Sequence, residues 1–462
     1  MHLLIIGGSD AGISAGLRAR QLHPDTDVTM LVADDYPNFS VCGIPYHVSG
    51  DVPDWHELAH RTQAQLESAG LDLRLRTRAT HIDPMAHAVT LRTPTGADGT
   101  IGYDRLVVAT GAEPSRAGID GLGEASPLGP ADGVHVLHSI DDMHAVQRDL
   151  DRRRPTSAVI IGAGYIGLEM AEALTRRGID VTMVQRGDEV LPTLDPDMGR
   201  LVHDELARHG VTVITGTTVH QVQRSSSHLI VAGTGPAGAL RIETGLVLAV
   251  VGVRPNVRLL TEAGARLGSA GAVSVDDHMR TGLPDIYAAG DGVTTHHRLL
   301  GPTWLPLGTT AHKQGRIAGE NATGGDVSFA GILGTQAVKV FDLVAARTGL
   351  RESEARRAGF SPLSVTATPD DHKAYYPGSH PVTIRLTGDL GTDRVLGAQL
   401  VGAFGAEIAK RVDVLATAIH TELTIPQLCD LDLTYTPPLA APWDAIQSTA
   451  QLWAPWTVPK PA

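Results

Sequence analysis

Cysteine is scarce in this chain, whose 462 residues include only two, Cys42 and Cys429. Two cysteines so far apart form neither a zinc motif nor the dense disulfide framework of a small secreted domain. We therefore expect no metal site and no structural disulfide. Histidine is more frequent, with 21 copies, but we interpret the adjacent pair His296-His297 as a solvated loop rather than as a ligand set.

Long apolar runs and an excess of positive charge are also missing. No stretch approaches the roughly 18 apolar residues of a membrane helix, and the first residues lack the basic segment of an export signal. The formal net charge of −13 disfavours nucleic acid and anionic membranes as partners, because both attract basic surfaces. We expect a cytoplasmic enzyme that acts on a small molecule, with a length that predicts two to four domains.

The chain opens with an apolar strand at residues 3–6 that turns directly into a helix. The turn contains four residues assigned to cofactor binding: Gly7, Gly8, Ser9 and Gly12. Glycines at such a turn let the backbone approach a pyrophosphate at the helix N-terminus. The turn predicts a dinucleotide-binding unit, although Ser9 replaces the middle glycine of G-x-G-x-x-G.

A carboxylate at the end of the second strand would normally bind the adenosine ribose. The strand at residues 28–32 ends in Val32, which cannot do so. Asp34 or Asp35 is the nearest candidate, and we assign the contact to Asp34.

A second unit begins with the strand at residues 158–161, and all three of its glycines are present, at Gly162, Gly164 and Gly167. This strand-turn-helix context is strongly indicative of a second dinucleotide site. Gln185 stands where an acid would select NAD, and Arg186 follows it, so NADPH is compatible with this site alongside NADH.

Further cofactor contacts are expected where apolar strands end in small or acidic residues. They are Thr110, Gly111, Gly252, Gly290 and Asp291. An aspartate at the carboxyl end of a strand is well placed to bind cofactor hydroxyls.

Cys42 lies in the segment of residues 38–46, directly after the first unit. Gly43 permits close backbone approach, and Pro45 suits the first turn of a helix that begins just after the cysteine. A helix N-terminus depresses a thiol pKa, which would make Cys42 a redox group. The alternative is that Cys42 is a small buried apolar residue.

The pattern changes near residue 329 to strands at 382–386 and 395–401 and a helix at 406–420, which predict an α+β domain. The fold class is therefore α/β, with two Rossmann-like dinucleotide-binding domains, for FAD and NAD(P)H, and a C-terminal α+β dimerisation domain. The expected boundaries are 1–112 with 248–325, 113–247, and 326–462.

Taken together, these features resemble the flavin-dependent pyridine nucleotide-disulfide oxidoreductases over essentially the whole chain. Disulfide members carry C-x-x-x-x-C, but the fifth residue after Cys42 is His47. A single cysteine in Cys-Gly-Ile-Pro-Tyr resembles the branch of coenzyme A-disulfide reductases, NADH oxidases and NADH peroxidases. Blocks at 329–335, 375–378, 410–419 and 433–438 agree with this branch.

Two residues depart from the branch. Oxidases and peroxidases usually carry a histidine where this chain has Asp10, and a carboxylate there disfavours a cysteine sulfenate. The reductases commonly have alanine at that place and asparagine where this chain has Val41. Tyr435, in a Tyr-Thr-Pro-Pro block, does match the reductases, and its alternative is a packed phenol.

The resemblance implies that NAD(P)H reduces FAD near Glu169 and that electrons then reach a mixed disulfide on Cys42, most plausibly with coenzyme A. Tyr435 or Asp10 would protonate the leaving thiol. A polysulfide or persulfide would suit the same thiolate. Three residues are assigned to substrate binding: Arg18, Arg20 and Tyr376. A solvated face is the alternative for the two arginines.

Two other functions stay open. One is an NADH oxidase that reduces oxygen through a Cys42 sulfenate, and the other is a flavoprotein that passes electrons to a protein partner. The resemblance also implies a homodimer in which Tyr435 reaches the partner's site. A resolving role for Cys429 is conceivable.

Overall fold

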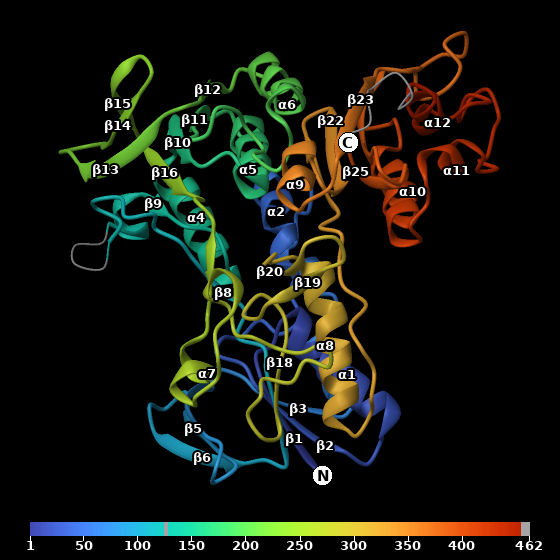
Figure 1. Cartoon of the computed structure of the whole chain (residues 1–462). Helices are drawn as coiled ribbons and strands as arrows, with labels where there is room; N and C mark the ends of the chain where they lie inside the picture. Colours follow the sequence, from blue (N-terminus) through green and yellow to red (C-terminus); the bar gives the residue numbers. More distant parts are fainter. Residues whose placement is uncertain (124–127, 454–462) are drawn as a thin grey trace.

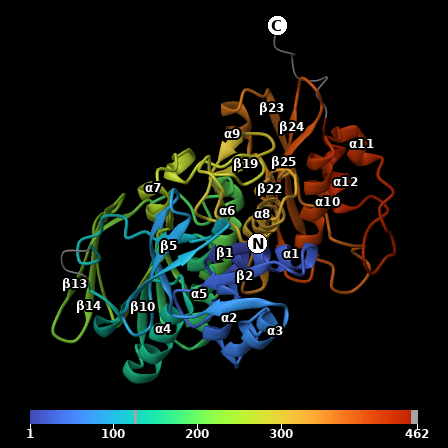
Figure 2. The same cartoon turned by 90° about the horizontal axis from the view of Figure 1, so that it is seen from below.

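The computed structural model describes residues 1–123 and 128–453, which form two parallel-sheet units and an antiparallel C-terminal domain (Figure 1). The predicted fold class is confirmed. Viewed from below, the C-terminal domain lies on one side and the β13–β14 hairpin at the opposite end (Figure 2). Within the described ranges, no helix has both the length and the apolar composition that crossing a membrane requires.

The first sheet has the order β18-β7-β1-β2-β3. Its strands are β1 (His2–Ile6), β2 (Asp27–Leu31), β3 (Leu71–Arg74), β7 (Arg105–Val108) and β18 (Ile286–Ala288). Leu3 and Ile5 pack with helices α1 (Asp10–Leu22) and α8 (Gly308–Ala322), whereas Leu4 and Ile6 face the meander β4 (Arg78–Asp83), β5 (Ala88–Arg92) and β6 (Asp98–Gly102). Because alternate side chains point to opposite faces, an all-apolar strand is buried on both.

Helices α1 and α8 approach each other unusually closely. A Cβ added at Gly315 of α8 would lie 2.1 Å from the Ala11 carbonyl oxygen, and one at Gly319 would lie 2.2 Å from that of Ala15. Glycine on one helix and alanine on the other therefore fix the relative position of the two helices.

The second sheet has the order β12-β11-β10-β16-β9 and repeats this design. Its strands are β9 (Val134–His135), β10 (Ser157–Ile161), β11 (Asp180–Val184), β12 (Thr212–Ile214) and β16 (Leu246–Ala249). One face packs on α4 (Ile140–Arg153), α5 (Tyr165–Arg176) and α6 (Pro196–Arg208), the other on β13 (Thr218–Arg224), β14 (Leu229–Gly235) and β15 (Gly238–Thr244). Strand β16 pairs with β10 up to Ala249, so the boundary predicted at residue 248 falls within this sheet.

A two-stranded ribbon joins the two units. Strands β8 (Ala112–Pro114) and β17 (Val253–Pro255) run antiparallel to each other where the chain leaves and re-enters the first unit. The Thr110 hydroxyl donates to the Asn256 carbonyl at 2.9 Å, and the Asn256 N–H donates to the Gly111 carbonyl at 3.0 Å. These bonds hold the outgoing and the returning segment of the chain together.

The C-terminal domain is an antiparallel sheet of order β21-β22-β25-β24-β23. Its strands are β21 (Gln336–Val340), β22 (Leu343–Gly349), β23 (Pro362–Ala367), β24 (Val382–Asp389) and β25 (Val395–Ala403), and its helices are α9 (Glu352–Arg357), α10 (Ile408–His420), α11 (Ile425–Cys429) and α12 (Ala445–Ala450). The predicted boundary for this domain includes residues 454–462, which lie outside the described part.

The remaining short elements lie around the junction of the domains or on the first unit. They are α2 (Ile44–Ser49), α3 (Gln63–Ser68), α7 (Arg258–Glu262), β19 (Thr295–His297) and β20 (Gly301–Thr303). The prediction of a solvated loop at His296-His297 is wrong: the pair is in β19, and burial lowers the pKa of His297 to about 4.

Candidate active site

The two glycine-rich turns make the same internal contact. A Cβ added at Gly12 would lie 2.0 Å from the Gly7 carbonyl oxygen, and one at Gly167 would lie 2.2 Å from the Gly162 carbonyl oxygen. Gly7 and Gly162 have φ values of 119° and 105°, a region that L side chains rarely adopt. The first and last glycines of each turn are therefore required by the chain itself.

The middle position of the motif is different. A Cβ added at Gly164 would meet nothing within 4 Å. Ser9, at the equivalent place, is the N-cap residue of α1 with ordinary extended dihedrals. The fold itself therefore tolerates a side chain at this position, which explains how Ser9 can interrupt the first motif.

This contrast predicts that two substitutions in one turn differ in their effect on stability. Gly167→Ala should lower the thermal unfolding midpoint clearly, because its Cβ would collide with backbone that cannot move away, whereas Gly164→Ala should leave the midpoint unchanged. In Gly164→Ala we expect weaker NAD(P)H binding at normal stability, because the added methyl occupies space that the ligand approaches. Calorimetry and nucleotide titration check both; equal loss of stability in the two variants would contradict the argument.

The adenosine end of the first unit is occupied by an apolar residue. A Cβ added at Gly8 would lie 2.7 Å from a Val32 methyl, so this valine packs directly against the turn. Asp35 pairs with Arg76 at 2.6 Å, while Asp34 accepts a bond from the Tyr36 N–H at 2.9 Å. Burial raises the pKa of Asp34. Asp35 is therefore already paired, and the contact of Asp34 with a ribose hydroxyl stays a prediction.

Cys42 lies in a short 3-10 turn, residues Val41–Gly43, which leads into α2, and its thiol is exposed. A Cβ added at Gly43 would lie 2.5 Å from a Leu58 methyl, so the close approach predicted for this glycine is found. Cys42 is thus an exposed residue, although surrounding protein atoms desolvate its thiol enough to raise the thiol pKa.

The prediction that the helix depresses the thiol pKa is wrong for the chain alone. Desolvation raises the pKa of Cys42, and the negative charges of Glu169, Asp10 and Asp291 raise it further. α2 has only six residues, and three carboxylates outweigh the dipole of so short a helix. The structure thus brings four predicted site residues together from four distant segments.

Glu169 and Tyr46 form a partly buried pair beside this thiol. The Tyr46 hydroxyl donates to Glu169 Oε1 at 3.1 Å, and desolvation raises the pKa of Glu169 to about 7. Helices α2 and α5 hold the two side chains together. Sequence reasoning gave Tyr46 no role, although its position four residues after the cysteine placed it on the same helical face.

The charge on Glu169 should govern the ionisation of Cys42. We expect Glu169→Gln to move the pH midpoint of Cys42 alkylation down by roughly one unit, because an ionised carboxylate that opposes the thiolate is removed. The difference should be largest above pH 7, where the wild-type carboxyl with its pKa of about 7 is ionised. Iodoacetamide kinetics measure it, with Glu67→Gln on exposed α3 as control. Identical profiles for wild type and Glu169→Gln would exclude the coupling.

Asp291 and Gly290 lie at the carboxyl end of β18, against the first turn. Desolvation and the charge of Asp10 raise the pKa of Asp291 to about 6. The Gly290 N–H donates to the Gln314 side-chain oxygen at 3.0 Å, and a Cβ added there would lie 3.0 Å from that of Ala11. The contacts predicted between the cofactor and Gly252, Thr110 and Gly111 stay predictions. In the structure, Thr110 and Gly111 form hydrogen bonds with Asn256 that join the two strands of the ribbon between the units.

Substrate binding by the two arginines of α1 stays a prediction, and both guanidinium groups have protein partners. Arg18 forms an ion pair of 2.7 Å with Glu320, with both side chains largely buried. Arg20 donates to the backbone carbonyl oxygens of Pro24 and Thr26. Both guanidinium groups are therefore held in place by the protein, so a substrate phosphate would have to compete for them or use their remaining N–H donors.

Gln185 and Arg186 follow β11, and both are predicted to contact the nucleotide. The Gln185 side chain is buried and accepts a bond from the Ala163 N–H in the glycine-rich turn at 3.3 Å. Arg186 is exposed. The amide therefore supports the turn, and the guanidinium is the group that can meet a ligand.

Tyr435 and Tyr376 lie on the C-terminal domain, away from the carboxylates around Cys42. Their side chains are 45% and 43% exposed. The Lys373 N–H donates to the Pro437 carbonyl at 3.3 Å, which places the two tyrosine loops side by side. Cys429, in α11 of the same domain, is partly buried, and its backbone carbonyl accepts from Gln447 at 2.8 Å.

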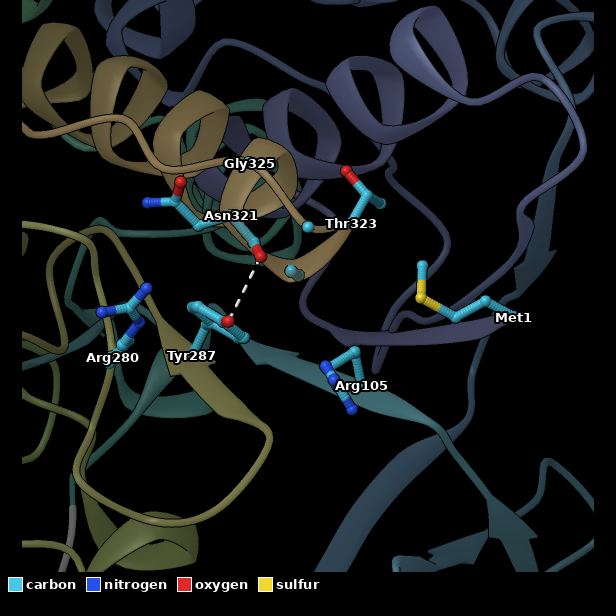
Figure 3. A pocket seen from close by; sticks show the side chains of 9 residues that line it. Met1, Arg105, Arg280, Tyr287, Asn321, Thr323 and Gly325 are labelled. Atoms are coloured by element: carbon cyan, nitrogen blue, oxygen red, sulfur yellow. Dashed lines mark hydrogen bonds between the residues drawn. The ribbon is translucent and has the colours of Figure 1, made fainter.

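A pocket of about 340 Å³ lies at the opposite edge of the first sheet (Figure 3). Met1 and Arg105 line it where strands begin, whereas Gly7 and Asp291 follow strand ends. Arg105 pairs with Asp285 at 2.9 Å, and the Tyr287 hydroxyl donates to the Asn321 carbonyl at 3.2 Å. Ligands of open parallel sheets bind at the carboxyl edge, so we do not assign this pocket to the active site.

Two dinucleotide-type units that meet at an accessible cysteine define a class, the dinucleotide-dependent oxidoreductases that act through a thiol. Comparison with known protein families narrows this class to one family. Residues 1–315 match the pyridine nucleotide-disulphide oxidoreductase family, and residues 335–446 match its dimerisation domain. The chain belongs to this family, whose members use FAD and NAD(P)H.

Three relatives illustrate the range of proteins to which the chain is similar. The chain is 31% identical to a CoA-dependent NAD(P)H sulfur oxidoreductase of Pyrococcus abyssi, covering 97% of each sequence. It is 36% identical to an NAD-dependent persulfide reductase from A. fulgidus, with a TM-score of 0.91 over 98% of this chain and 82% of that one. It is 28% identical to a water-forming NADH oxidase from Lactobacillus brevis, with a TM-score of 0.90 over 98% and 97%.

Proposed function

We propose that this oxidoreductase reduces a small-molecule disulfide, coenzyme A disulfide or a coenzyme A persulfide or polysulfide, through Cys42 alone. The observation that carries the proposal is the single accessible cysteine among the carboxylates at the carboxyl edge, with the other cysteine on α11 of a different domain. A lone thiol cannot close an internal disulfide, so an attacked substrate stays attached to the protein.

The reaction balances as two steps. The Cys42 thiolate attacks one sulfur of the substrate disulfide, so that a Cys42–substrate disulfide forms and one thiolate leaves and takes up a proton. Two electrons and a proton then convert this mixed disulfide to a Cys42 thiolate and a second thiol. When bound, FAD supplies the route for the two electrons from NAD(P)H.

The chain's own residues have separate tasks in this scheme. The two glycine-rich turns hold the pyrophosphates of FAD and NAD(P)H. The carboxyl group of Glu169, with a pKa of about 7 and a bond from Tyr46, can hold or release a proton beside the thiol at neutral pH. Asp10 opposes a second negative charge at this place, which favours thiol chemistry over a sulfenate.

We also propose that the enzyme is a homodimer in which Tyr435 and Tyr376 serve the partner's site. Exposed apolar and aromatic side chains gather on the C-terminal domain: Tyr375, Tyr376, Phe404, Tyr435, Leu439 and Trp443. Monomeric proteins rarely expose so many large apolar side chains on one domain. The match of this domain to the family's dimerisation domain supports the same conclusion.

The nucleotide preference is proposed to depend on Arg186. If NADPH is the donor, Arg186→Ala should raise its KM by about 10- to 100-fold, because a charge-assisted bond to the 2′-phosphate is lost. The KM for NADH should not change. Steady-state kinetics with both nucleotides test this, with Arg200→Ala on α6 as the control; equal effects on both nucleotides would contradict it.

The experiment that decides the function compares acceptors. The flavin-loaded enzyme is given NADH or NADPH anaerobically with coenzyme A disulfide or a coenzyme A persulfide, and separately in air without either. Disulfide-dependent oxidation without oxygen supports the proposal. Fast oxidation in air that no disulfide accelerates would instead establish an oxidase, and reduction of an added electron-transfer protein alone would establish the flavoprotein alternative.

A further inference from the structure

Three metal-ligating side chains from three distant segments meet at the start of α1. Asp10 is the first residue of that helix, His312 lies in the second turn of α8, and His60 lies in the loop before α3. Their ligand atoms all lie within 4.8 Å of one another. The spacing along the sequence gave no sign of this group, and the sequence had predicted no metal site.

The closest pair already has the separation that a tetrahedral ion requires. Asp10 Oδ1 and His312 Nε2 are 3.3 Å apart. Zinc-to-nitrogen and zinc-to-oxygen bonds of about 2.0–2.1 Å give a ligand-to-ligand edge of roughly 3.3–3.4 Å in a tetrahedron. The third side chain, His60, is exposed, so its ring can turn toward the pair without disturbing the core.

A second contact orients the imidazole of His312, whose side chain is 44% exposed. His312 Nδ1 lies 2.9 Å from the Ser14 hydroxyl, one helical turn after Asp10 on α1. When Nδ1–H donates to this hydroxyl, the lone pair of Nε2 points toward Asp10. Metal-binding histidines characteristically use their other nitrogen in this way. The tight packing of Gly315 on Ala11 fixes α8 against α1, so the arrangement is rigid.

The other two groupings of metal-ligating residues in the described part of the chain are explained without an ion. Glu205 accepts a bond from the Asp342 N–H at 3.0 Å and pairs with Arg208. Asp276 caps its own turn, accepting from the N–H groups of residues 278 and 280 at 2.9 and 2.8 Å. Neither of these groupings combines two histidines with one carboxylate.

We propose that Asp10, His60 and His312 bind one divalent transition-metal ion, with Zn²⁺ as the best fit and water in the fourth position. Two imidazoles and one carboxylate are ligands that suit this ion. The site goes beyond the proposed function and does not depend on it.

Zinc binding to the flavin-loaded protein tests the site. Thiolates bind zinc as well, so the measurement uses a background in which Cys42→Ser and Cys429→Ser remove the only two cysteines, or wild type with both thiols alkylated. Isothermal titration with ZnCl₂ should give one ion per chain with a micromolar or lower Kd. Flavin absorbance and thermal unfolding confirm that each variant is folded.

The variants distinguish this site from nonspecific binding. His312→Asn, His60→Gln and Asp10→Asn should each weaken zinc binding more than tenfold, and Ser14→Ala by roughly tenfold, the range typical of an orienting partner. His23→Gln, an exposed histidine at the other end of α1, should bind like the background protein. No zinc binding up to millimolar concentration, or full affinity in His312→Asn and Asp10→Asn, would overturn the proposal.

Discussion

Replacing Cys42 by serine should reduce disulfide-dependent turnover by at least about 10³-fold, because a hydroxyl cannot form the mixed disulfide that the reaction requires. The same variant should still bind flavin and still be reduced by NAD(P)H. Cys42 is an exposed residue, so the change from sulfur to oxygen removes a reacting atom with little effect on packing. Stopped-flow reduction and steady-state disulfide assays separate the two half-reactions.

The chain provides a matched control for this experiment. Cys429→Ser makes the same change at the only other cysteine, and we expect wild-type turnover from it. Mass spectrometry of the oxidised wild type should find a small thiol attached to Cys42 and no link between Cys42 and Cys429. Wild-type rates in Cys42→Ser would remove the central role of this residue, and a large loss in Cys429→Ser would point to a resolving cysteine.

The second large effect concerns Tyr435 and the partner subunit. Tyr435→Phe should lower disulfide turnover by about 100-fold, the scale of one positioned proton donor. Tyr375→Phe, on the same exposed face, is the control and should have little effect. Flavin reduction by NAD(P)H should be normal in both variants, because Tyr435 is assigned only to the protonation of the leaving thiol.

Mixed dimers show which subunit supplies the tyrosine. When Cys42→Ser and Tyr435→Phe chains are refolded together, half of the dimers are mixed. If the tyrosine acts on the partner, each mixed dimer contains one fully intact site, so the mixture should recover about 25% of the wild-type rate. If the tyrosine acts within its own chain, no intact site forms and the mixture stays at the mean of the two homodimer rates, below about 1% of the wild-type rate.

Several features of the protein are local and could therefore be predicted from the sequence. Gly7 and Gly12 mark the first turn because their contacts are made within a few residues, and the same holds for Gly162 and Gly167. Apolar runs of four or five residues specify strands that are buried on both faces, and alternation marks the antiparallel domain. The short helix after Cys42 follows from Pro45 in the same way.

The chemistry around Cys42 could not be predicted locally. Whether its thiol ionises depends on desolvation and on carboxylates contributed by α1, α5 and the end of β18. Likewise, Arg18 looks like a free cation on a helix, and only the packing of α8 shows that Glu320 neutralises it. Electrostatic effects depend on distance in space rather than on separation along the chain, so spacing in the sequence contains little information about them.

The sequence by itself thus determined the order of the domains and the two glycine-rich turns, and it predicted Cys42 as the redox cysteine. Each is decided by backbone sterics or hydrophobic periodicity over a few consecutive residues. Only the tertiary structure decided the charge that Cys42 experiences, the partners of the α1 arginines and the meeting of Asp10, His60 and His312. The Arg18–Glu320 pair and the Asp10–His312 contact depend on how α1 and α8 pack, about 300 residues apart, and the close contact of glycine with alanine fixes these helices in the folded chain. The charge at Cys42 also requires α5 and the end of β18.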